Sequence, residues 1–253
     1  MKKICIPSFV LFMMSLVIHF GNSDTLAEQP GSLTKADCEA IVAAAEDQAN
    51  IEVSAVRVLP NGSSTTTKMQ IACVDREGNI LVFRSMPDAL AGAIDVARAK
   101  ANTGRAVSSN ENALSSRSIG CLSQAVTAVN HPGATPAFGP LWMIGNSNQA
   151  PPVNGNAKTH GKVGGIIQFP GGLPLYKDSD GDGINDTLAG AIGVSGDGVE
   201  QDEDVAEAGT NAPQIGSTTD YQAPAHLLAA APFFIDVASA NVSVDGDPCT
   251  IGQ

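Results

Sequence analysis

Residues 68–86 read KMQIACVDREGNILVFRSM and carry a clear strand-turn-strand pattern. Its first half alternates between two faces, with Met69, Ile71 and Cys73 on one and Gln70, Ala72 and Val74 on the other. A period of two residues indicates a strand. The polar residues 76–79 predict a turn, and 80–84 predict a return strand that Pro87 stops. The sequence therefore predicts a β-hairpin with two distinct faces.

Helical patterns lie on both sides of this hairpin. Thr34 is an N-cap residue with Asp37 three positions later, and apolar side chains follow at helical spacing to about Ala49. A second helix is predicted from about Leu90 until Gly104. Further helices are expected over 200–208, where acidic residues read as a solvated helix start, and over 226–231.

Further strands complete the predicted core. Residues 53–59 are short and β-branched, regular structure is expected again at 164–169, and 170–174 is interpreted as a constrained turn. Residues 188–194 predict a strand that contains Gly190 and Gly193, and glycines there indicate close approach by another backbone or a ligand. The fold class is therefore α+β.

Two segments depart from this regular pattern. Residues 106–162 are rich in Ser, Asn, Gly and Pro, carry the single Trp with His131 and His160, and predict a mostly irregular insertion. An insertion of this length is usually functional or partly disordered. The tail from about residue 210 is also predicted to be irregular, apart from its one short helix.

The first 27 residues have the features of a signal peptide. Lys2 and Lys3 precede an apolar run from Ile4 to Phe20, and small residues follow at 21–27. A retained membrane anchor is the alternative, although the run is short for a bilayer span. We therefore expect a single domain over 28–253 in a periplasmic or secreted protein without a stable membrane anchor.

The charge and cysteine content restrict the function. The formal charge is −12, and cleavage after residue 27 would remove two lysines and one aspartate, which makes the chain one unit more negative. This balance argues against nucleic acid and anionic membranes. Export would leave Cys38, Cys73, Cys121 and Cys249, for which three pairings are open. Cys38 or Cys73 could instead be a buried apolar residue, and a Cys121–Cys249 bond would tie the insertion to the tail.

Three segments resemble the GlcG/HbpS family (DUF336, heme-binding-protein-like). They are the hairpin CVDREGNILVFRSM at 73–86, the helix AIDVARAKANT at 93–103, and FPGGLP at 169–174 followed by GAIGVSG at 190–196 and Glu200-Gln201-Asp202. The likeness covers about 33–105 and 163–209. The insertion and an acidic loop at 178–186 depart from the family pattern.

The resemblance implies a five-stranded antiparallel sheet packed with helices in profilin-like layers, and frequent assembly into homo-oligomers. Similar proteins include extracellular heme-binding proteins and domains attached to cobalamin-related enzymes. The leading hypothesis is therefore an exported protein that binds heme or another tetrapyrrole for sensing, storage or delivery. A role as accessory partner of a periplasmic dehydrogenase or cytochrome is an alternative.

Five residues are candidates for binding such a cofactor. His131 and His160 could be axial ligands, although surface histidines without a role are common; Met86 and Met143 are weaker, soft alternatives. Arg98 or Lys100 could meet a heme propionate, but two residues apart on a helix they point in different directions. Gly193 could allow close approach of the ligand. No CxxCH motif occurs, which excludes covalent c-type heme.

The acidic loop DSDGDGIND at 178–186 carries a second type of chemistry. Asp178, Asp180 and Asp182 hold positions 1, 3 and 5 of a calcium loop, the carbonyl of Ile184 holds position 7, and Asp186 holds position 9. Ala189 replaces the bidentate glutamate at position 12. The sequence predicts a structural calcium ion, with a solvated acidic hairpin tip as the alternative.

Catalysis is a third hypothesis. A small enzyme acting on an organic metabolite could use Lys100 or Asp202 as acid or base in a glycine-rich pocket. Export and the absence of histidines from the predicted core favour a binding role, and we assign no catalytic residue.

Overall fold

The computed structural model describes residues 31–123, 125–126, 137–138, 161, 163–229, 243–244 and 247–248. The signal peptide predicted at 1–27, His131, Met143, His160 and Cys249 lie outside these residues. Cys121 lies within a helix, but its side chain is not described. No helix in the described part of the chain has the length and apolar character needed to span a bilayer.

A four-stranded antiparallel sheet forms the centre of the fold, in the order β4-β3-β8-β7. Its strands are β3 (Gln70–Asp75), β4 (Ile80–Ser85), β7 (Gly172–Lys177) and β8 (Thr187–Ser195). β3 and β4 are the predicted hairpin, and β3 also pairs along its length with β8, from Gln70 opposite Ser195 to Asp75 opposite Gly190. Residues 68–86 therefore supply one central strand and one edge.

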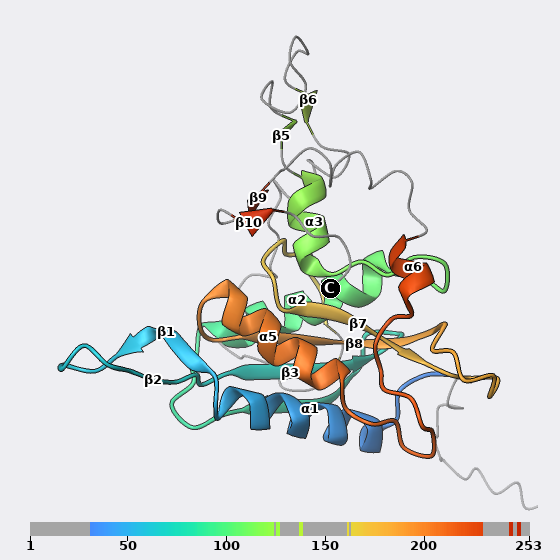
Figure 1. Ribbon diagram of the computed structural model, residues 1–253, viewed down its shortest axis with the longest axis horizontal. Coiled ribbons are helices and arrows are strands. Elements are labelled where there is room, and N and C mark those ends of the chain that lie inside the picture. Colours follow the sequence, from blue (N-terminus) through green and yellow to red (C-terminus); the bar gives the residue numbers. More distant parts are fainter. Residues whose placement is uncertain are drawn as a thin grey trace, which may run out of the picture.

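Helices cover both faces of this sheet (Figure 1). α1 (Lys35–Ala49) and α5 (Val199–Thr210) pack side by side on one face, and α2 (Ala93–Val107) packs on the other against β8, β7 and β3. The period-two pattern of β3 explains this arrangement, because Ile71 and Cys73 join the core beneath α1 while Ala72 and Val74 join the core beneath α2. The sheet therefore lies between two helical layers, as the predicted α+β arrangement of helices packed on an antiparallel sheet requires.

The sheet has four strands rather than the five expected. β1 (Val53–Val58) pairs only with β2 (Ser64–Thr66), and this ribbon projects from one end of the sheet (Figure 1). Backbone N–H groups of β1 donate to side chains instead of to a further strand: Ala55 to Asp197 and Arg57 to Ser54. β1 and β2 therefore form a sheet of their own, which the Ala55–Asp197 hydrogen bond attaches to the loop after β8.

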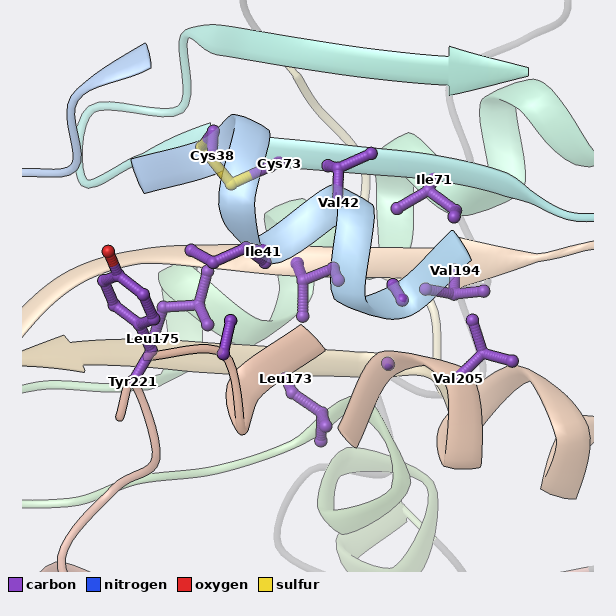
Figure 2. Close-up of a cluster of buried hydrophobic side chains, with 14 of the residues drawn as sticks. Cys38, Ile41, Val42, Ile71, Cys73, Leu173, Leu175, Val194, Val205 and Tyr221 are labelled. Atoms are coloured by element: carbon purple, nitrogen blue, oxygen red, sulfur yellow. A yellow bond between two sulfur atoms is a disulfide. The ribbon is translucent and has the colours of Figure 1, made fainter. Parts of the chain in front are cut away.

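A disulfide joins Cys38 of α1 to Cys73 of β3, with Cα atoms 5.6 Å apart. Figure 2 shows it beside Ile41, Val42 and Ile71, all of them fully buried. Of the pairings left open by the sequence, the structure therefore contains Cys38–Cys73. The alternative that Cys38 or Cys73 is a buried residue with a free thiol is wrong.

Several local expectations need correction, and α2 continues past Gly104 to Val107. Residues 164–169 form no regular element, and Gly172–Lys177 is strand β7 rather than only a turn. Pro174 fits there because β7 is an edge strand, where a missing N–H costs no ladder bond. The insertion contains the helix α3 (Ser116–Ser123), although its serine-rich sequence is more typical of an irregular segment.

The remaining elements are short. The tail contains α6, and 211–222 is irregular but packs on the core through Ala212 and Tyr221. Their bounds are α6 (Ala225–Ala229), β5 (Ala125–Val126) paired with β6 (Ala137–Phe138), and β9 (Ser243–Val244) paired with β10 (Asp247–Pro248).

Candidate functional site

A buried ion pair lies where the sheet, α2 and α5 meet. The Nζ of Lys100 is 2.6 Å from Oδ2 of Asp202 and also donates to the carbonyl oxygen of Val194 at 2.8 Å. The two charged side chains are 1% and 4% exposed. α2, the end of β8 and α5 each contribute one of these groups, so segments far apart in the sequence meet at this pair.

Two glycines make room for this ion pair. A Cβ on Gly171 would lie 2.8 Å from the Val194 oxygen and 3.1 Å from Asp202, and a Cβ on Gly172 would lie 2.3 Å from the Lys100 oxygen. Gly171 also has φ of 101°, which favours glycine. The glycines at 171 and 172 therefore let β7 start directly against Lys100 and Asp202.

Burial shapes the electrostatics of the pair. It lowers the pKa of Lys100 and raises the pKa of Asp202, and the attraction between the two groups opposes both shifts. The interpretation of Asp202 as part of a solvated helix start is therefore wrong, because Asp202 faces inward toward Lys100. A substrate would have to break this enclosed pair to use either group as an acid or base.

A second charged cluster attaches α3 to α5. Nη2 of Arg117 is 2.6 Å from Oε2 of Glu200, and its Nε donates to Glu203. Burial raises the pKa of Glu203 to about 7, against the opposing attraction of Arg117. This contact fixes the described beginning of the insertion to the core.

Four polar residues share one face of α2, and we call them the α2 polar face: Asp95, Arg98, Asn102 and Arg105. Arg98 pairs with Asp95 at 2.8 Å, and Arg105 donates to Asn102 at 2.6 Å. Asn102 in turn donates to the Gly165 carbonyl at 2.5 Å. The Nε atoms of both arginines are buried without a hydrogen-bond partner. Each of the two guanidinium groups therefore keeps one N–H that is buried and unpaired.

The segment after the insertion runs beside the α2 polar face. Gly161, which follows His160 in the chain, accepts a hydrogen bond from the Ile80 N–H at 2.8 Å, and Val163 donates to the Gly78 carbonyl at 2.9 Å. The Arg105 guanidinium lies against Gly78, within 2.6–2.8 Å of where a Cβ would stand. The described chain immediately after His160 and one end of the α2 polar face thus meet at the same hairpin turn.

The predicted cofactor residues occupy different places. Arg98 is on the α2 polar face, whereas Lys100 points toward Asp202, so the two diverge as expected. The position of a Cβ on Gly193 lies 2.1 Å from the Ala97 carbonyl, which means that the α2 backbone fills that side of the strand. Met86 is buried, and its sulfur accepts the Met69 N–H at 3.3 Å. His226, on α6, is exposed.

The acidic loop brings three of its predicted ligands together. Each of Asp178, Asp180 and Asp182 offers a carboxylate oxygen within 4.8 Å of the others. Asp178 accepts the N–H groups of Gly181 at 2.7 Å and Gly183 at 2.9 Å, which curls the loop around it. Asp186 is not in this group, and the Ile184 carbonyl accepts the Asp186 N–H at 3.0 Å.

Comparison with protein families gives a match to the model described as haem degrading protein HbpS-like, over residues 33–211. The chain belongs to the HbpS-like family. The matched region includes the ion pair, the α2 polar face and the acidic loop, and it ends shortly after α5. A comparison with curated protein sequences finds no match.

Solved structures with related folds accompany this family match. Protein ORFY of Klebsiella pneumoniae, a DUF336 protein, is 24% identical, with 72% of this chain and 91% of that chain covered and a TM-score of 0.42. A PduOC:heme complex is 23% identical, with 74% and 99% covered and a TM-score of 0.47. HbpS itself is 21% identical, with 72% and 90% covered and a TM-score of 0.41.

Few features of the sequence indicate the charged clusters in this HbpS-like chain. Arg117 stands in a serine-rich stretch that resembles a loop, and Glu203 stands on a helix rich in acids. The only signal for α3 is weak: Ile119 and Leu122, three positions apart, give residues 116–123 a short amphipathic pattern beside Arg117.

Proposed function

We propose that this HbpS-like protein binds heme or a closely related tetrapyrrole outside the cytoplasm, for sensing, storage or delivery. The family match over residues 33–211 carries the proposal. A homo-oligomer and export through the 1–27 signal peptide belong to the same proposal.

The α2 polar face supports this function. Heme carries two propionates, and a guanidinium binds a carboxylate through charge-assisted hydrogen bonds. Arg98 and Arg105 each have a buried Nε without a partner, which a propionate could use. The Nζ of Lys100 donates to both Asp202 and the Val194 carbonyl, whereas Arg98 pairs with Asp95 and still keeps an unpaired Nε, so Lys100 fits this role less well. Among the described residues only His226 offers an imidazole, so His131 and His160 remain the candidates for the axial ligand.

Heme titration followed by the Soret band tests the proposal. We expect saturable binding by the mature protein, and Arg98→Ala should raise the dissociation constant about 10-fold or more, since a charged hydrogen bond contributes roughly 1.5–3 kcal/mol. Arg98→Lys should restore part of the affinity. His131→Ala and His160→Ala, measured separately, should identify the ligand by loss of the shifted band.

The matched control for Arg98 is Arg84→Ala, which removes an arginine whose side chain is 51% exposed on β4. It should bind heme as the parent protein does. Absence of any saturable band in folded protein would overturn the heme proposal and favour the accessory role beside a dehydrogenase or cytochrome.

We also propose a structural calcium ion in the acidic loop. Ca–O distances of about 2.3–2.6 Å allow ligand oxygens up to roughly 5 Å apart, and the three grouped carboxylates satisfy this limit. Calcium should raise the melting temperature, and Asp180→Asn should reduce this rise. Asp47→Asn, at an exposed position of α1, is the control and should leave the rise unchanged. An identical melting temperature in calcium and in chelator would contradict the ion.

A further inference from the structure

The two edges of the main sheet are finished differently. On β7 no outward backbone N–H is left for another strand. The Gly172 N–H donates to Ser116 at 2.9 Å, Pro174 has no N–H, and the Tyr176 N–H donates to the Tyr221 carbonyl at 3.0 Å. Closure of this kind prevents another strand from pairing at an edge. β7 is therefore a protected edge.

The opposite edge, β4, is open along most of its length. At its start the Ile80 N–H donates to Gly161, but the Met86 N–H at the other end points inward to Met69 at 3.0 Å. Because N–H directions alternate along an antiparallel ladder, those of Phe83 and Ser85 point outward. Within the described chain, neither N–H has an acceptor.

The side chains of this open stretch are apolar on both faces. Leu81 and Val82 pack partly against the core under α1, and Phe83 packs partly against the core under α2, yet all three remain only half-buried. No proline, lysine or acid interrupts residues 80–85. An edge with these properties is a template for a further strand.

We propose that β4 pairs antiparallel with β4 of a second copy around a two-fold axis, which joins two four-stranded sheets into one. An antiparallel strand pair is self-complementary, as a two-fold interface requires. Charge favours a second copy at this edge: the chain carries −12 overall, whereas 80–85 contains no acidic residue and its single charged side chain is Arg84. The inference builds on the homo-oligomer proposed above and adds the surface that forms it.

The charge on Arg84 also selects the register. Because Gly161 already occupies the start of β4, two registers pair the outward N–H groups of Phe83 and Ser85 within the strand: Phe83 opposite Phe83, or Arg84 opposite Arg84. Like charges directly opposite each other destabilise a strand pair. The register centred on Phe83 places Arg84 opposite Val82 of the partner subunit and avoids that repulsion.

Sedimentation of the mature protein without added heme tests the interface. We expect a dimer, and Ser85→Pro, which removes an outward N–H, should weaken association at least 10-fold. Ser85→Ala, which keeps that N–H, is the matched control and should remain dimeric. Circular dichroism and an intact Cys38–Cys73 bond show whether the proline variant has folded.

Cysteine crosslinking tests the register by a separate route. Val82→Cys combined with Arg84→Cys should give a disulfide-linked dimer, and Arg84→Cys alone should give little. Efficient crosslinking by Arg84→Cys alone would overturn the proposed register.

Three outcomes would overturn the interface itself. They are a monomer at all concentrations, a dimer unaffected by Ser85→Pro, and a dimer that Val56→Lys on the exposed apolar face of the β1–β2 ribbon dissociates instead. Because no heme is added, a failure here is independent of a failure to bind heme.

Discussion

At the scale of single residues, the buried Lys100–Asp202 pair predicts a large effect on stability. Removal of one partner leaves the other buried and uncompensated, which costs about 3–5 kcal/mol. Lys100→Met should therefore lower the free energy of unfolding by about that amount, as measured by urea denaturation.

The double variant Lys100→Met with Asp202→Leu should recover most of this loss, because two apolar side chains can replace a buried ion pair. Lys35→Met, which removes a lysine paired with Glu39 at 3.7 Å on the exposed side of α1, should change stability by less than about 1 kcal/mol. Equal effects of the two lysine substitutions would show that Lys100 is not enclosed in solution.

Glu203 predicts a pH dependence. Burial raises its folded pKa to about 7 from an ordinary value of 4.5, so between these values the folded state binds the proton more strongly than the unfolded state does. This residue therefore makes stability fall as pH rises from about 4.5 to 7. Glu203→Gln should flatten that part of a plot of melting temperature against pH, and an unchanged slope would contradict the buried placement.

At the scale of elements, glycines set how closely α2 approaches the sheet. A Cβ at Gly193 would stand 2.1 Å from the Ala97 carbonyl and 2.3 Å from the Ala101 nitrogen, so Gly193→Ala must push α2 away from β8. Overpacking of this kind costs at least about 1–3 kcal/mol. Gly164→Ala, where a Cβ would meet nothing within 4 Å, is the matched control in thermal unfolding.

The same scale shows what the sequence could predict. α1, α2, β3, β4 and β8 follow from periodicity, capping and turn residues, because local pattern determines them. The sequence does not predict β7, because its proline and glycine indicate a turn, and only its position at a protected edge makes a strand possible. The clusters around Lys100 and Arg117 depend on contacts between residues more than 80 positions apart, which no local pattern records.

At the scale of the whole molecule, the remaining cysteines define the last prediction. Cys38 and Cys73 are paired, so among the four cysteines beyond residue 27 only Cys121 and Cys249 are left. α3, which carries Cys121, contacts β9, and β10 ends at Pro248, the residue before Cys249. We expect a second disulfide between these two cysteines in protein exported to an oxidising compartment.

Peptide mapping under non-reducing conditions measures this bond directly. The expected result is one linked pair for each disulfide, no thiol that reacts with an alkylating reagent, and a mature chain that begins after about residue 27. The second bond closes a loop of more than 100 residues, for which stabilisation of about 4–5 kcal/mol is expected. Cys121→Ser should therefore lower stability and free the Cys249 thiol. Alkylation of both cysteines in the parent protein would contradict the bond and leave the Cys38–Cys73 disulfide alone.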